Sequence, residues 1–345
     1  MSLRAKRSNL TPYSGSAIEV IGIGAINIDC LCQVKELVTD GETVMEHIKT
    51  APGGSAANTI YGLAKLGIRT GFIGATGDDE EGKASVRDLK AVGVDTSQIQ
   101  IKKGEKTGYA LCLSDKLGRR SIYVLPGANN LLDWQDISLT YLNQAKIVHL
   151  SSFVEDKQFN IQIELVEKLS NSVKISFAPG MLYAIKGIKA LLPLLTRTHI
   201  LFINRGEIEQ LTGKDFTSGA KECLGLGCQI VVVTLGKGLA SESGKVFTSY
   251  ICHGKEEYKI ESRPRHCEAF PLRHCEERSD EAIPGEAQPE ATGAGDAYAS
   301  GFLFGFLKGE NLQQCGQLGD TMARYAMSKA GAREGLPGLN AILGE

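Results

Sequence analysis

Short apolar runs alternate with amphipathic segments along most of the chain. The runs are rich in β-branched residues and end in glycine or a polar residue, a pattern typical of strands buried on both faces. They cover 17–26, 69–77, 145–153, 172–180, 198–204 and 228–236. Segments with helical spacing lie between them, at 55–67, 80–93, 157–170, 184–194, 205–212 and 216–225. The alternation predicts an α/β fold with a mostly parallel central sheet covered by helices on both faces.

Two segments, 30–54 and 99–127, break this rhythm, because they alternate apolar and polar residues around short turns. The pattern predicts antiparallel strands. Ligands of parallel sheets bind at the carboxyl ends of the strands, and the two segments flank a glycine pair at 53–54. We therefore expect a small β lid over that edge. An extension of the sheet edge with no gating role is the alternative.

The composition is that of an ordinary soluble protein. The chain has 345 residues, 42% of them hydrophobic, and a net charge of −2. This balance gives no reason to expect a nucleic-acid or membrane partner, and no run reaches the roughly 18 apolar residues of a membrane span. No apolar region follows the basic N-terminus, so 1–16 is expected to be a flexible extension rather than a secretion signal. We expect a cytoplasmic protein whose nine cysteines are reduced thiols.

The segment 262–290 is polar, carries four of the ten prolines and repeats Arg-His-Cys-Glu at 265–268 and 273–276. Histidine and cysteine are zinc ligands, but adjacent ligands lack the usual gap of about two to four residues. The segment is therefore predicted to be an atypical insertion rather than a metal site.

The sequence ATGAGDAYASG at 291–301 carries the strongest chemical signal. Glycines before a helix leave N–H groups free, and together with the helix dipole these can stabilise a phosphoryl group in transfer. Asp296 would repel a bound phosphate, but it can take the proton of an attacking hydroxyl. The stretch indicates phosphoryl transfer to an alcohol. The alternative is a glycine-rich helix start with an acidic first-turn residue.

Two other glycine motifs come close to nucleotide-binding patterns but are not predicted to bind nucleotides. Residues 77–84 approach a P-loop, but Ala84 replaces the hydroxyl residue and four carboxylates fill the loop. Residues 22–27 approach a dinucleotide fingerprint, but Asn27 replaces its last glycine. A phosphate would have to be held in another way.

Five motifs in order resemble those of the ribokinase-like (PfkB) carbohydrate kinase family. They are GAINID at 24–29, PGGSAANTIYGLAKLG at 52–67, NRGE at 204–207, TLGKG at 234–238 and TGAGDAYASGFL at 292–303. The resemblance covers about 18–337 and is interrupted mainly at 262–290. It implies a three-layer α/β/α fold with a β-sheet lid. It also implies an ATP-dependent phosphotransferase with a sugar or nucleoside acceptor, and often a homodimer joined through the lids.

The resemblance also implies the roles of the site residues. Asp296 is the expected general base, and the expected anion hole consists of Gly293, Ala294 and Gly295. The residues expected to bind the acceptor hydroxyls are Asn27, Asp29, Gly53, Gly54 and Asn58. Asn204 and Glu207 are expected to organise Mg²⁺ and the phosphates, often through water. The residues expected to contact the nucleotide are Thr234, Gly236 and Gly238.

Single residues have simpler alternatives. Asp29 could form an Asx turn at a strand end, and Asn58 could cap a helix. Asn204 and Glu207 could form a variant of the capping box.

Two positions depart from the family. The usual Asp-Thr-Thr before the anion hole is Glu290-Ala291-Thr292 here. Family members bind an activating monovalent cation near this point, so Glu290 and Thr292 are the candidate K⁺ ligands, and the departure leaves potassium activation open. Ala178 replaces an aspartate that relatives often carry.

The acceptor stays open between a sugar and a nucleoside, and a non-catalytic ligand-binding protein is the remaining alternative. Arg119 or Arg120 could meet a phosphorylated acceptor, but neighbours on a strand face opposite ways, so at most one points inward. Phe153, Tyr109 and Tyr123 are candidates for stacking on a purine.

Overall fold

The computed structural model describes residues 17–117, 119–240, 244–262 and 292–343. The expectations for the N-terminal extension at 1–16, the insertion and its His-Cys pairs fall outside these residues, apart from Ser262. The candidate cation ligand Glu290 also lies outside them, whereas Thr292 lies inside.

The large sheet has nine strands in the order β13-β12-β11-β10-β9-β8-β1-β4-β5. The strands are β1 Val20–Ile23, β4 Thr70–Gly77, β5 Asp95–Lys102, β8 Ile147–Ser151, β9 Lys174–Ala178, β10 Thr198–Asn204, β11 Ile230–Ala240, β12 Val246–His253 and β13 Glu256–Glu261. Neighbours from β5 to β11 pair in parallel, and β12 and β13 extend the sheet antiparallel. The prediction of a mostly parallel sheet is confirmed.

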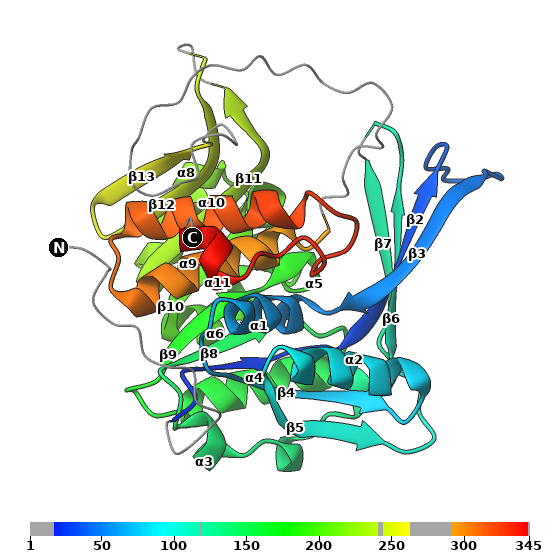
Figure 1. Ribbon diagram of the computed structural model, residues 1–345. Coiled ribbons are helices and arrows are strands. Elements are labelled where there is room, and N and C mark those ends of the chain that lie inside the picture. Colours follow the sequence, from blue (N-terminus) through cyan, green and yellow to red (C-terminus); the bar gives the residue numbers. More distant parts are fainter. Residues whose placement is uncertain (1–16, 118, 241–243, 263–291, 344–345) are drawn as a thin grey trace.

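Helices cover both faces of this sheet (Figure 1). They are α1 Ser55–Lys65, α2 Glu80–Ala91, α3 Leu139–Leu142, α4 Asp156–Lys168, α5 Gly180–Ala184, α6 Gly187–Arg197, α7 Arg205–Thr212, α8 Phe216–Gly225, α9 Ala294–Lys308, α10 Leu312–Ala326 and α11 Leu339–Leu343. Two short 3₁₀ helices, Gly127–Leu131 and Trp134–Asp136, precede α3.

The side chains of β10 show the three layers directly. Leu201 and Ile203 pack into one core with residues of α4, α6, α7 and α8. Ile200 and Phe202 point the other way, into a second core with residues of α1, α9 and α10. Because successive strand residues face opposite sides, a continuous apolar run of this kind needs cover on both faces.

The lid is a separate sheet of four strands in the order β3-β2-β6-β7, which stands beside the body in Figure 1. The strands are β2 Asn27–Val34, β3 Met45–Gly53, β6 Gly108–Ser114 and β7 Arg120–Leu125. Two details differ from expectation. Residues 99–102 belong to β5 of the large sheet, and β2 pairs with β6 in parallel. A strand at the edge of the large sheet is covered on one face only, so it alternates apolar and polar residues as a lid strand does. The sequence pattern therefore could not distinguish β5 from a lid strand.

No helix within the described ranges is long and apolar enough to cross a membrane. The seven cysteines that the structure describes are free and buried.

Candidate active site

Asp296 lies in the first turn of α9 and is held by the first turn of α1. Ser55 Oγ donates to its Oδ1 over 2.7 Å, and Asn58 Nδ2 donates to its Oδ2 over 2.9 Å. Thr59 Oγ1 donates to the backbone carbonyl of Asp296 over 3.3 Å. The two glycine-rich motifs, which are more than two hundred residues apart, therefore build one site, and Asn58 is not a helix cap.

The amide of Asn58 is held from its other side by Arg333. Arg333 Nε donates to Asn58 Oδ1 over 2.8 Å, and Nη2 donates to the carbonyl of Gly53 over 3.0 Å. Its Nη1 pairs with Asp88 of α2 at 2.7 Å. One buried guanidinium therefore connects the C-terminal segment, α1, α2 and the end of the lid strand β3.

Asp29 is buried in the middle of β2 rather than at a strand end, so it is not an Asx turn. Gly53 of β3 is in register with Asn27, and a Cβ there would approach the carboxylate of Asp29 to 2.2 Å. Gly54 has a φ of 98°, and its Cβ would meet the carbonyl of Ala25 at 2.1 Å. The glycine pair is required because β3 turns into α1 directly against Asp29.

Asn27 is oriented by Asn129. Asn129 Nδ2 donates to Asn27 Oδ1 over 2.9 Å, while Asn129 Oδ1 accepts the N–H of Ile26 over 2.9 Å. Both asparagines are buried. The side chain of Asn27 is therefore fixed beside Asp29 at the start of the lid.

Burial raises the pKa of both central carboxyls. Desolvation raises the pKa of Asp296 to about 6, although the hydrogen bonds from Asn58 and Ser55 and the charges of Arg333 and Arg120 lower it. Desolvation also raises the pKa of Asp29 to about 6, with Arg333 lowering it and Asp296 raising it. A carboxyl group with such a pKa is ionised at neutral pH and is a stronger base than an exposed one.

Asn204 and Glu207 form a capping box at the start of α7, as one alternative held. Asn204 Oδ1 accepts the N–H of Glu207 over 2.9 Å, and Glu207 Oε2 accepts the N–H of Asn204 over 3.0 Å. Burial raises the pKa of Glu207, and the charge of Asp296 raises it further. Glu207 therefore both caps α7 and lies close enough to Asp296 for the two charges to interact.

The remaining nucleotide candidates lie on β11, next to β10. Thr234 is in register with Asn204, where β10 and its pairing with β11 end. Gly236 and Gly238 have φ values of 62° and 84°, where the pairing with β12 is interrupted. The sheet thus brings together the NRGE and TLGKG motifs.

The lid arginines point in different directions. Arg119 pairs with Asp115 at 2.7 Å within the lid. Arg120 is in register with Ser114, which is in register with Gln33, so it shares the face of Asp29. Its charge also lowers the pKa of Asp296 and Glu207. Arg120 is therefore the arginine that faces the site.

The candidate aromatic residues do not face Asp29. Tyr109 is in register with Ile28, and Tyr123 with Leu111 and Cys30, so both lie on the opposite face of the lid. Phe153 is buried in the core beneath the sheet.

The sequence profile of the pfkB family carbohydrate kinase matches residues 17–259 and 275–339. The chain belongs to this family. The interruption of the match, at 260–274, overlaps the segment 262–290 that is expected to be an insertion. As a pfkB kinase, the protein is a sugar or nucleoside kinase.

Its relatives span both classes of acceptor. An uncharacterized sugar kinase of Archaeoglobus fulgidus is 34% identical over 279 residues, which cover 80% of this chain and 98% of the relative. A nucleoside kinase of Methanothermobacter thermautotrophicus is 24% identical over 322 residues, 92% of each chain. The solved structure of Arabidopsis thaliana ribokinase complexed with ribose and ATP is 24% identical, with a TM-score of 0.71 over 95% of this chain and 98% of that one.

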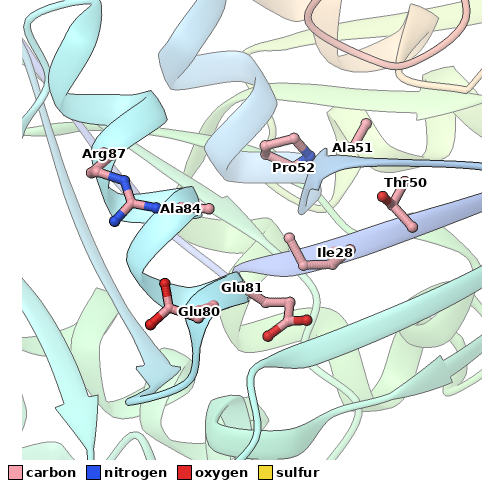
Figure 2. Close-up of a pocket in the computed structure, with 8 residues that line it drawn as sticks. All are labelled: Ile28, Thr50, Ala51, Pro52, Glu80, Glu81, Ala84 and Arg87. Carbon is pink, nitrogen blue, oxygen red and sulfur yellow. The ribbon is translucent and has the colours of Figure 1, made fainter.

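A pocket of about 360 Å³ in this pfkB kinase lies between the lid strands β2 and β3 and helix α2 (Figure 2). Ile28 and Pro52 line it from the lid, and Glu80, Ala84 and Arg87 line it from α2. Ile28 follows Asn27 and precedes Asp29 on β2, so its side chain points to the opposite face. Its lining includes none of the residues expected to bind the acceptor, which are Asn27, Asp29, Gly53, Gly54 and Asn58.

Sequence reasoning missed two residues of the kinase site, Ser55 and Arg333. Ser55 stands inside the recognised motif PGGSAAN and could have been found as the first residue after the glycine pair. Arg333 lies in the sequence GAREGLPG near the C-terminus, and a charged residue among glycines is typical of an exposed loop. Only the packing of that segment against α1 reveals its role.

Proposed function

We propose that this pfkB kinase transfers the γ-phosphoryl group of ATP to a hydroxyl group of a sugar, with Asp296 as the general base. The placement of Asp296 carries the proposal. Its carboxylate lies in the first turn of α9, is held by Ser55 and Asn58, and lies within electrostatic range of Asp29.

The reaction needs one proton acceptor and one site for developing negative charge. The acceptor hydroxyl gives its proton to Asp296 as its oxygen forms a bond to the γ-phosphorus, and the bond from the γ-phosphorus to the bridging oxygen breaks to release ADP. The N–H groups of Ala294 and Gly295, after Gly293 in the left-handed conformation, are placed to stabilise the transferring group.

The acceptor is held by the groups beside the glycine pair. Asp29 and Asn27 offer carboxylate and amide groups that pair with the hydroxyls of a diol. Gly53 and Gly54 allow the backbone to pass close to Asp29 and Ala25, and a backbone without side chains lets a sugar ring approach closely. Asn58 donates to Asp296 and adds a polar group between the base and the acceptor.

The nucleotide is assigned to the region where β10 ends beside β11, from Thr234 to Gly236 and Gly238. No group of three or more potential metal ligands occurs in the part of the chain that the structure describes. Mg²⁺ keeps several waters and needs only one or two protein carboxylates beside substrate phosphates, so the carboxylate of Glu207 fits such an ion. Glu207 and Asn204 would hold that hydrated ion, which supplies neutralisation of phosphate charge. A K⁺ ion would involve Thr292 and Glu290.

A sugar is favoured over a nucleoside by the direction of the aromatic side chains. A purine or pyrimidine gains affinity from an aromatic ring stacked on its face. Tyr109 and Tyr123 face away from Asp29, and Leu31, Ala110 and Cys112 form a small aliphatic cluster on the inner face of the lid. Such a surface suits a small polyol ring.

The test is ADP release from Mg²⁺-ATP over a panel of neutral sugars, phosphorylated sugars and nucleosides. Turnover of at least one neutral sugar is expected, with a higher kcat/KM than any nucleoside. Preferential turnover of a nucleoside would overturn the sugar assignment and keep the kinase. Tight binding of a panel member without turnover would favour a non-catalytic binding protein.

We also propose that the kinase forms a homodimer through the outer face of its lids. Ile48, Tyr123 and Leu125 lie on that face and are 64%, 61% and 69% exposed. An apolar sheet face of this kind is rarely left to solvent. Light scattering at micromolar concentration should give a dimer mass, and Tyr123→Lys should give a monomer. A monomeric wild-type protein would overturn this proposal.

A further inference from the structure

Arg333 is an arginine buried beside a catalytic carboxylate without contacting it. Its side chain is 5% exposed, and it donates to Asn58 Oδ1, to the Gly53 carbonyl and to Asp88. The guanidinium also lies over the ring of Tyr61, 5.3 Å from its centroid. Burying a guanidinium costs free energy unless hydrogen-bond partners in fixed positions compensate for the lost water. The contacts of Arg333 therefore also fix the groups that they join.

The chemistry of the donors and acceptors leaves Asn58 one orientation. A guanidinium has only N–H donors, so the amide atom that faces Arg333 must be the oxygen. An ionised carboxylate only accepts hydrogen bonds, so the amide atom that faces Asp296 must be the nitrogen. Asn58 satisfies both because an amide carries one acceptor and one donor group. Without Arg333, the amide could turn and present its oxygen to Asp296.

We propose that Arg333 is a positioning residue of the kinase reaction: it locks the amide of Asn58 in the orientation that donates to Asp296 and so aims the base at the acceptor hydroxyl. The same guanidinium holds the Gly53 carbonyl, at the point where lid strand β3 enters α1. Arg333 therefore fixes the base and the acceptor-binding turn relative to each other. The inference rests on Asp296 being the base, as proposed above.

The competing interpretation is that Arg333 only joins elements of the fold. The protein supplies a matched control, because Arg324 of α10 forms a similar pair with Asp320 at 3.1 Å, with side chains 15% and 6% exposed. That pair lies on α10 and not on α1, α2 or the lid turn. Arg324→Met should lower thermal stability without changing kcat per folded molecule.

The first experiment compares Arg333→Lys and Arg333→Met with Arg324→Met in steady-state kinetics. Because small displacements of a positioned group can cost about 100-fold in rate, Arg333→Met should lower kcat by about 10- to 100-fold. It should also raise the KM for the acceptor and leave the KM for ATP unchanged. Arg333→Lys keeps the charge without the planar fork and should recover part of kcat. Equal kcat per folded molecule in Arg333→Met and Arg324→Met would overturn the proposal.

The pH dependence gives a second readout that a purely structural role would not move. The charged groups that act on the carboxyl of Asp296 are Arg333, Arg120, Asp29 and Glu207. Loss of the Arg333 charge raises the pKa of Asp296, so the acid limb of kcat should shift to higher pH in Arg333→Met. Asp88→Asn leaves the Arg333 charge unpaired and should shift the limb to lower pH. Shifts in the same direction would contradict the proposal.

A measurement without turnover separates this proposal from the proposed function. The carboxyl ¹³C resonance of Asp296 can be titrated by NMR in the wild type and in Arg333→Met. An upward shift in the variant, together with loss of the wild-type Asn58 side-chain N–H signals, supports positioning even if no acceptor in the panel is phosphorylated. Unchanged titration and unchanged Asn58 signals would overturn it even if the protein is an active kinase.

Discussion

Asn58 Nδ2 lies 2.9 Å from Asp296 Oδ2, although 238 positions of the chain separate the two residues. The contact joins the first turn of α1 to the first turn of α9. It brings a residue expected to bind the acceptor within hydrogen-bond distance of the residue expected to activate it. In the proposed reaction, one hydrogen-bonded unit holds both the acceptor and the base.

Replacing Asn58 by aspartate should disrupt this unit with almost no change in shape. Asn58→Asp puts a second carboxylate against Asp296, and like charges at this distance cannot both ionise easily. The pKa of Asp296 should rise, and kcat at pH 7 should fall by about 100-fold or more. Raising the assay pH should restore part of the activity. A variant with unchanged kcat at pH 7 would show that Asn58 does not act on the base.

Substitutions of Gly293 and Gly295, at the start of α9, should have different effects: the first should lower stability and the second should lower activity. Gly293 has a φ of 80°, and a Cβ there would lie 2.2 Å from Ala332 Cβ, so Gly293→Ala should lower Tm by several degrees. A Cβ on Gly295 meets no atom within 4 Å, so Gly295→Ala should fold normally. Its methyl group stands where the phosphoryl group is proposed to lie, and kcat should fall on the order of 100-fold. Thermal melts with kinetics on both variants check this contrast, and wild-type kcat in Gly295→Ala would contradict it.

The raised pKa values predict how activity depends on pH. Asp296 must be ionised to accept a proton, so kcat/KM should rise with pH up to about 6 and then level off. A limb near pH 4, the ordinary range of an aspartate, would mean that the base is not a buried carboxyl. The measurement is a pH–rate profile between pH 4.5 and 8 with a verified acceptor.

The raised pKa of Asp29 predicts how the stability of the folded protein depends on pH. Its folded pKa, about 6, lies above the unfolded value of roughly 4, so its contribution to stability is present below pH 4 and is lost as the pH rises through 6. Asp29→Asn should therefore raise Tm at pH 7.5 more than at pH 4.5, while the KM for the acceptor rises. Melting curves at the two pH values provide the check, and a lower Tm at pH 7.5 would contradict the assignment.

The two adjacent arginines of the lid form a natural pair of test and control. Arg120 faces the site and lowers the pKa of Asp296, whereas Arg119 pairs with Asp115. Arg120→Met should lower kcat by about tenfold or more and shift the acid limb to higher pH. Arg119→Met should change neither. Equal effects of the two substitutions would show that the lid face has been assigned wrongly.

The order of elements could be predicted from the sequence because it depends on local patterns, whereas the candidate site residues followed from the resemblance of five motifs to the family. A buried strand such as β10 or a motif such as GAGD can be recognised from about ten consecutive residues. The contacts of Ser55 with Asp296 and of Arg333 with Asn58 could not, because they depend on the packing of α1 against α9 and against the C-terminal segment. The strand β5 was assigned to the lid in part, since an edge strand and a lid strand share one alternation. The parallel pairing of β2 with β6 likewise depends on contacts across some eighty residues.

The most direct test of the central claim is kcat of Asp296→Asn with a verified acceptor. The substitution keeps the shape of the side chain and removes the proton acceptor. The account predicts a fall in kcat of roughly 100- to 10,000-fold. Affinity for the nucleotide should hold or improve, since a negative charge near the phosphates has gone. Turnover close to the wild-type rate would contradict the account, because Asp296 would then be only an acidic residue at the start of a helix.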